Sequence, residues 1–159
     1  SETENTELMA ESNVGKFYRV KVSYGQYTDT GKPMSVTADD GTTVILWGYG
    51  GVYPVAVIRN CDFPTVRSLL GDDMLYDVEH ANNPGSSVFS ALNGLRDRLP
   101  EADVTVATFK PLVGVTSITD VRGFCTYYDY DIAGRLAGKS FREGGINRML
   151  EKYTYNYMK

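Results

Sequence analysis

Two groups of polar side chains in this sequence have types that could carry chemistry. The single histidine, His80, could remove a proton from Cys61 or Cys125 and so create a thiolate nucleophile. Two pairs of adjacent carboxylates, Asp39-Asp40 and Asp72-Asp73, could bind a hard cation or act as an acid and base. Each possibility depends on whether the rest of the sequence brings suitable groups together.

The spacing of these groups favours structural roles. The cysteines form no CxxC and the chain has one histidine, so the four ligands of a structural zinc site are missing. The carboxylate pairs lack the alternating ligands of a calcium loop, and turns or helix N-caps explain them. No GxGxxG, P-loop or GxSxG motif occurs. We therefore expect no catalytic residue, no metal and no cofactor, a surface position for His80, and cysteines that are either disulfide-bonded or free thiols.

Aromatic residues are the better candidates for a binding site. An aromatic plane can stack on the apolar face of a sugar, and a phenol adds a polar contact. The alternative is that the same rings form the core and the cross-strand ladder of a small β-sheet. The candidate ligand-binding residues fall in two blocks: Trp47, Tyr49 and Tyr53 in the first, and Tyr127, Tyr128, Tyr130, Tyr153, Tyr155 and Tyr157 in the second.

Length and charge limit the classes of protein and partner. The chain has 159 residues, which suits one domain. Sixteen Lys and Arg against twenty Asp and Glu give a net charge of −4, which argues against nucleic acid as a partner. No apolar run approaches the roughly 18 residues of a membrane span. Residues 1–13 are acidic and poor in large apolar side chains, so we expect a flexible arm or a short surface helix there, followed by a single domain over residues 14–159.

Alternating and β-branched segments predict strands on both sides of a helical region. Residues 17–24 alternate with period two, and the other predicted strands cover residues 34–37, 42–49, 52–58, 104–109, 115–119, 124–130, 136–141 and 149–157. Tyr153, Tyr155 and Tyr157 would share one face of the last strand. Turn residues rich in Gly, Asp and Pro separate the first strands, which is typical of an antiparallel meander.

The middle of the chain has helical signals instead. Asp62 can cap a helix that ends at Gly71, and a second helix is predicted over residues 74–80. Ser86 or Ser87 can cap a third helix, whose apolar positions Val88, Leu92, Leu95 and Leu99 have helical spacing. Residues 62–100 are too few for an independent core. The predicted fold class is therefore α+β: an antiparallel, hairpin-rich sheet with an insert of two or three helices packed on one face.

Similar segments occur twice in the chain. Residues 35–41 (SVTADDG) match residues 117–123 (SITDVRG), and aromatic strands follow both. A Tyr-x-x-x-Gly-basic unit also occurs twice, over residues 27–32 and 130–135. In such a unit Asp would accept a backbone hydrogen bond, Gly would supply a positive φ, and Tyr would pack on the strand. Each unit therefore predicts a hairpin.

These residues resemble the YD-repeat, or Rhs-repeat, family, over about residues 17–157. The resemblance is carried by residues 111–120 (PLVGVTSITD), Tyr130-Asp131 with Gly134-Arg135-Leu136, the blocks 46–49 and 53–56, and the end of the helical region. It departs from the family at Thr28, where the repeat usually has Asp, and at Val121, where this branch usually has Pro.

The resemblance implies a non-catalytic structural or interaction module. In the family, hairpins coil into a β-shell, often on secreted or cell-surface proteins, and this chain is similar to a terminal or capping piece of such an array. Its expected partners are the rest of a YD-repeat array, a neighbouring protein chain, or itself, each bound through edge strands. The alternative is a small carbohydrate-binding module that uses the Tyr and Trp faces.

Overall fold

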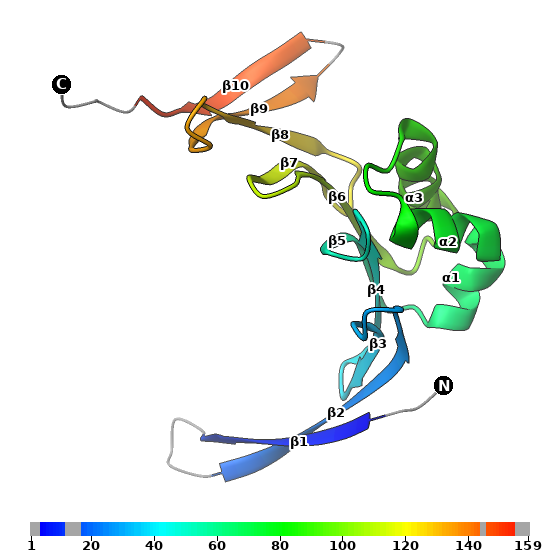
Figure 1. The fold of residues 1–159 in the computed structure, drawn as a ribbon. Helices are drawn as coiled ribbons and strands as arrows, with labels where there is room; N and C mark the ends of the chain where they lie inside the picture. Colours follow the sequence, from blue (N-terminus) through cyan, green and yellow to red (C-terminus); the bar gives the residue numbers. More distant parts are fainter. Residues whose placement is uncertain (1–3, 12–16, 144–145, 155–159) are drawn as a thin grey trace.

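The chain forms one curved antiparallel sheet with three helices on its outer side (Figure 1). The computed structural model describes residues 4–11, 17–143 and 146–154. Within these residues, ten strands are arranged in the order of the chain, and all nine adjacent pairings are antiparallel. The strands are β1 (Glu4–Glu11), β2 (Phe17–Tyr27), β3 (Pro33–Ala38), β4 (Gly41–Gly48), β5 (Tyr53–Arg59), β6 (Asp103–Lys110), β7 (Gly114–Thr119), β8 (Cys125–Tyr130), β9 (Leu136–Glu143) and β10 (Ile146–Lys152). The predicted α+β fold class is confirmed.

Three of the hairpin turns have the same backbone structure. In each of the turns 28–32, 120–124 and 131–135, the backbone N–H of the first residue donates to the carbonyl oxygen of the fifth residue. The three distances are 2.9, 2.9 and 2.8 Å. The fourth residue is glycine with φ of 85°, 84° and 77°, and its N–H donates to the first carbonyl at 2.9 Å in each case. Glycine is favoured here because other residues adopt this left-handed region at a cost. Both predicted Tyr-x-x-x-Gly-basic units are thus hairpin turns.

The side chain of the first turn residue completes each turn. Asp131 Oδ1 accepts the Arg135 N–H at 2.9 Å, and Asp120 Oδ1 accepts the Phe124 N–H at the same distance. Thr28 stands in this position in the first turn, and its hydroxyl accepts the Lys32 N–H at 3.0 Å. The departure from Asp at residue 28 therefore preserves the hydrogen bond.

Replacing Thr28 by valine is expected to lower the free energy of unfolding by about 1–2 kcal/mol, because it leaves the Lys32 N–H without its side-chain acceptor. Thr28 is only 5% exposed, so water compensates poorly for the lost hydroxyl. Urea unfolding followed by circular dichroism measures the change. Thr28→Ser keeps the acceptor and serves as the control; equal losses in the two variants would contradict this role for the hydroxyl.

The similarity between residues 35–41 and 117–123 holds for the strands but not for the turns. Residues 35–37 lie in β3 and residues 117–119 lie in β7, each before a hairpin. However, Ala38 pairs with Gly41, so the first hairpin has a two-residue loop, whereas the second uses the five-residue turn 120–124. The number of residues between the strands decides which turn forms.

The helices lie between β5 and β6, where an insert over residues 62–100 is predicted. They are α1 (Phe63–Leu70), α2 (Asp72–His80) and α3 (Ser86–Arg98). The Asp62 side chain accepts the Thr65 N–H at 3.0 Å and caps α1, as predicted. The cap of α3 is Gly85, and no side chain caps this end, so the predicted cap at Ser86 or Ser87 is wrong. Both serines instead lie inside the first turn of α3.

The hydrophobic core lies between these helices and the middle of the sheet. The helices pack on β4 and β6, and Val88, Leu92 and Leu95 of α3 are buried, as their spacing predicts. Leu99 follows the helix and is partly buried against the same core. The sheet contributes mainly the buried residues Val44, Leu46, Val55, Ala56, Ile58, Val104 and Val106. The helical insert therefore shares one core with the sheet.

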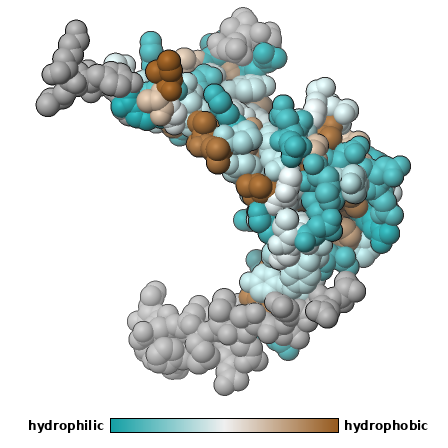
Figure 2. Space-filling view, viewed as in Figure 1, coloured by the Kyte–Doolittle hydropathy of each residue, from teal (hydrophilic) through white to brown (hydrophobic). Residues whose placement is uncertain are grey.

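The sheet curves so that the helices lie on its convex side and no helix covers the concave side (Figure 1). Figure 2 shows that the helical side is mainly hydrophilic, with hydrophobic residues spaced along the concave side. Register shifts occur in the β4–β5, β6–β7, β8–β9 and β9–β10 pairs. Bulges of this kind increase strand twist and bend a sheet, so they account for the curvature.

Both ends of the chain differ from the prediction. Residues Glu4–Glu11, expected within a flexible arm or short helix, form β1, which pairs with β2 from Glu4↔Tyr24 to Glu11↔Phe17. The long ladder of β2 supplies the hydrogen bonds that ordering this acidic segment needs. At the other end β10 stops at Lys152, which pairs with Gly138 of β9, and the Tyr153 N–H still donates to the Ala137 carbonyl at 2.7 Å. Tyr153 follows the strand, and Tyr155 and Tyr157 lie outside the described residues.

Among the described residues, none of the three helices is both long enough and apolar enough to cross a membrane.

Candidate functional site

Trp47 joins β4 to the start of β3. Its indole N–H donates to the Pro33 carbonyl at 2.9 Å, and the Lys32 ammonium lies 4.8 Å from the ring centroid. The same ammonium donates to the carbonyls of Gly51 and Val52 at 2.7 and 3.0 Å. A cation over an indole face is favourable. Lys32 thus occupies a face of Trp47 that a sugar would need.

Tyr49 and Tyr53 belong to an aromatic cluster with Phe89 and Phe109. The Tyr53 and Phe109 rings stack at 4.8 Å, and Tyr49 meets both of them edge-on. The Tyr49 hydroxyl accepts the Phe109 N–H, and the Tyr53 hydroxyl accepts the Leu112 N–H, both at 2.8 Å. Tyr49 is 7% exposed. These phenols hold the β4–β5 turn against β6 and the turn that follows it.

Tyr128 and Tyr130 lie on β8 and contact their neighbouring strands. The Lys139 ammonium lies 5.7 Å from the Tyr128 ring centroid. The Tyr130 hydroxyl donates to the Val115 carbonyl at 2.6 Å, and burial raises the pKa of this phenol. Tyr153 is exposed, and its hydroxyl bonds to the Glu151 carboxylate. Binding of a ligand by these faces stays a prediction, and the structure places the described rings in cross-strand contacts.

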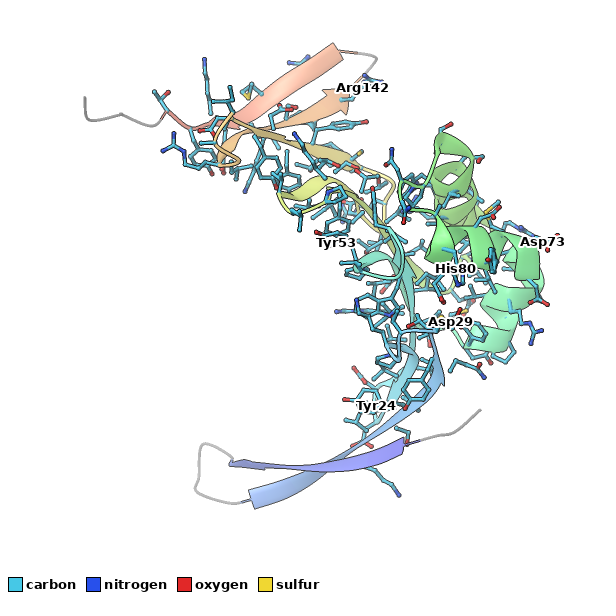
Figure 3. All side chains as sticks on the ribbon, viewed as in Figure 1. Tyr24, Asp29, Tyr53, Asp73, His80 and Arg142 are labelled. Carbon is cyan, nitrogen blue, oxygen red and sulfur yellow. The ribbon has the colours of Figure 1, made fainter. Side chains whose placement is uncertain are left out.

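The two ring nitrogens of His80 contact a side-chain oxygen of Asp29 and the backbone oxygen of Tyr76 rather than a cysteine. Its Nε2 lies 2.8 Å from Asp29 Oδ2, and its Nδ1 lies 3.0 Å from the Tyr76 carbonyl oxygen. Figure 3 shows His80 and Asp29 together, where the end of α2 meets the β2–β3 turn. Cys61 lies beside the N-terminus of α1 and Cys125 lies on β8, and both are free thiols. The structure therefore does not assemble a cysteine–histidine pair from these residues.

Glu79 completes a small charged cluster with His80 and Asp29. Glu79 Oε2 lies 3.3 Å from His80 Nε2 and accepts the Asp29 N–H at 3.2 Å. One ligand atom from each residue falls within 4.8 Å of the others, which is close enough to hold a metal ion. The same atoms already form hydrogen bonds and ion pairs with one another, and these contacts attach α2 to the β2–β3 turn. The absence of a bound metal stays a prediction.

The pKa of His80 is expected to lie above its usual value of about 6.5, chiefly because of the hydrogen bond to Asp29 and then the one to Tyr76. A raised pKa in the folded state means that the cluster stabilises the fold fully at low pH. This contribution is lost as pH rises from about 6.5 through the folded-state pKa. His80 is the only histidine, so its ring proton resonances report this titration directly by NMR. Asp29→Asn should lower the midpoint; a wild-type midpoint at or below that of a free histidine would contradict the cluster.

Asp39-Asp40 have the turn role that the sequence predicts, whereas Asp72-Asp73 do not cap a helix, because the N-cap of α2 is Gly71. Asp72 begins α2 and forms two hydrogen bonds with the Arg67 guanidinium, at 2.7 and 3.0 Å. The hydrogen bond from Arg67 holds the pKa of Asp72 below its usual value. Asp73 follows in the first turn of α2, and Asp39-Asp40 form the β3–β4 loop.

A polar cleft between α3 and β6–β8 was not predicted from the sequence. It has a volume of about 890 Å³ and is lined by Ser86, Phe89, Ser90, Asn93, Gly94, Arg96, Asp97, Thr108, Thr116, Ser117, Thr119, Gly123, Cys125 and Tyr127. The signal that could have indicated it is the polar stripe of α3, in which Ser86, Ser90, Asn93 and Asp97 share a face at helical spacing. Of the predicted tyrosines that the structure describes, Tyr127 alone lines this cleft.

Comparison with known proteins gives structural similarity but no family. No family model matches the chain, and no curated protein matches it. A chain in the crystal structure of TcdB2-TccC3-Cdc42 superposes with a TM-score of 0.48 and 14% sequence identity. The match covers 96% of this chain and 8% of that chain.

Proposed function

We propose that this chain is a non-catalytic structural module, a terminal or capping segment of a YD-repeat wall that extends by edge-to-edge strand pairing. The observation that carries the proposal is the sheet order: within the described residues, β1 pairs with β2 alone and β10 pairs with β9 alone. An edge strand presents unpaired backbone N–H and C=O groups that can pair with another strand. Among the described residues, β1 and β10 therefore each offer an edge at which the rest of the array could pair, and a terminal segment needs one such edge.

Two exposed apolar side chains of β10 support pairing at that edge. Met149 is 60% exposed and Leu150 is 49% exposed. β10 also carries the exposed charged residues Arg148, Glu151 and Lys152 and a bulge at Met149–Glu151, which are features that oppose pairing, so the apolar pair is what favours it. The exposed apolar pair would be buried if a further strand joined the sheet, and burial of apolar area favours that association.

The repeated turns support the assignment to a YD-repeat wall. Turns 28–32, 120–124 and 131–135 share one set of backbone hydrogen bonds, and bulges recur along the sheet that they join. A secreted or cell-surface location and a partner from the same array belong to this proposal, because they rest on the family resemblance. Glycan binding through the aromatic faces has no observation in its favour beyond the residue types.

Analytical ultracentrifugation of the chain across the micromolar range tests the proposal. Wild-type protein is expected to self-associate, and Met149→Lys with Leu150→Lys is expected to shift it toward monomer, since charges on an edge strand oppose pairing. The control is Leu112→Lys, because Leu112 is 98% exposed at the β6–β7 turn rather than on an edge strand. A wild-type chain that is strictly monomeric, or equal loss of association in the control, would count against edge pairing.

A further inference from the structure

The cleft between α3 and β6–β8 has two polar walls that face each other. On α3, the side chains of Val88, Leu92 and Leu95 enter the core, while the stripe at residues 86, 90, 93 and 97 lines the cleft. On the sheet, pairing places Thr108 opposite Ser117 and Ser117 opposite Tyr127, so these three share one face. A helix that packs on a sheet normally presents apolar side chains to it. Here the polar walls leave a hollow beside the core.

Several polar groups in the cleft have no partner in the protein. Within the part of the chain that the structure describes, the exposed side chains of Ser86, Ser90 and Asp97 and the half-buried hydroxyl of Thr119 make no hydrogen bond or ion pair with the protein. The Arg96 Nε is buried and likewise lacks an acceptor. A ligand with many donors and acceptors would satisfy such groups in place of water.

Other groups in the cleft are held in position before any ligand arrives. Thr108 Oγ1 lies 2.6 Å from Ser117 Oγ and 2.7 Å from Thr116 Oγ1. Arg96 donates to Asn93 Oδ1 at 3.2 Å and to the Val104 carbonyl at 3.0 Å. Positioned side chains lower the ordering cost of binding.

The aromatic residues and the charge of the cleft indicate the class of ligand. Phe89 and Tyr127 line it from opposite walls, and the Arg142 guanidinium lies 6.0 Å from the Tyr127 ring centroid. The charged residues in the lining are Arg96 and Asp97, whose charges cancel. Hydroxyl and amide groups with aromatic rings and no net charge suit a neutral polyhydroxyl ligand better than a phosphate or a polyanion.

We propose that the cleft between α3 and β6–β8 is a binding site for a neutral saccharide. The site is separate from the proposed edge pairing, because it lies on the helical side of the sheet and contains no residue of β10. The aromatic contact in this site is Tyr127 with Phe89, and Trp47, Tyr49 and Tyr53 are not part of it.

Ligand-observed NMR with maltohexaose, cellohexaose and chitohexaose, and with a heparin hexasaccharide as the charged comparison, tests the site. At least one neutral probe is expected to bind at millimolar concentration or below. Ser90→Trp should weaken that binding at least about tenfold by filling the cleft. Ser87→Trp is the matched control, because Ser87 is exposed on the same helix but does not line the cleft.

A second variant tests the polar contacts without changing the shape. Thr119→Val is isosteric and removes a hydroxyl that has no protein partner, so the fold should keep its stability while saccharide binding weakens. Binding of none of the neutral probes, binding of the heparin probe alone, or equal binding by wild type and Ser90→Trp would each overturn the proposal. The Met149→Lys, Leu150→Lys protein should bind the saccharide as the wild-type protein does. The outcome of the saccharide experiment is therefore independent of the outcome of the edge-pairing experiment.

Discussion

Replacing Leu92 by alanine is expected to lower the free energy of unfolding by about 2–5 kcal/mol. Leu92 lies in the middle of α3, is 0% exposed, and belongs to the core that α3 shares with β4–β6. Removing the isobutyl group loses its burial and leaves a cavity that a helix held between two loops cannot collapse fully. Because sheet and helices share one core, the whole transition should move to lower urea, not only the helical signal.

Urea unfolding measured by both far-UV circular dichroism and Trp47 fluorescence tests this result. The two probes should report the same midpoint, since the indole is bonded to the Pro33 carbonyl in the sheet. Ser87→Ala on the exposed face of the same helix is the control and should change the free energy of unfolding by less than about 0.5 kcal/mol. A loss at Leu92 as small as that of the control would contradict a shared core.

Replacing Gly48 by alanine is expected to cost about 1–3 kcal/mol through overpacking. A Cβ atom at this position would lie 2.8 Å from Val55 Cγ1 and 3.2 Å from the Val78 carbonyl oxygen of α2. The sheet and α2 would have to separate, because neither the β5 side chain nor the helix backbone has space to move. Glycine at residue 48 therefore lets α2 approach β4.

A double-mutant cycle with Val55→Ala tests the cause of this loss. Val55→Ala alone should destabilise by removing buried methyl groups, and the double variant should lose less than the sum of the two, with a coupling of about 0.5–3 kcal/mol. Gly94→Ala on α3 is the control, since its Cβ would meet nothing within 4 Å. It should stabilise the protein by up to about 1 kcal/mol through helix propensity. Strict additivity of Gly48→Ala and Val55→Ala would contradict the steric explanation.

Local patterns were sufficient to predict most elements of the fold. Alternation and β-branched residues located β3 to β9 to within a few residues, because strand pairing in a meander joins neighbours in sequence. Asp62 and the apolar spacing of α3 located the helical insert for the same local reason. The first strand was missed because its acidic composition gives no burial signal; β2 supplies its hydrogen bonds instead.

The candidate site could be predicted only in part. The aromatic residues were identified by type, but residue type does not distinguish a ring that faces solvent from one that meets Phe109 or accepts a backbone N–H. The partner of His80 is Asp29, which lies 51 residues away in sequence. No local pattern links the two residues, so only the packing of α2 beside the β2–β3 turn could bring them together.

The local features of the fold follow directly from the order of residues: the turns with Asp or Thr in the first position and Gly in the fourth, the strands between them, the capped first helix, and the apolar stripe of α3. Each depends on residues within one turn or strand, where backbone sterics and side-chain periodicity act directly. Tertiary packing instead sets the enclosure of Tyr49, the contact of His80 with Asp29, the cleft between α3 and β6–β8, and the strands that lie at the edges of the sheet among the described residues. These depend on how bulges curve the sheet and on where a shared core holds the helices, and both arise from contacts between residues distant in sequence.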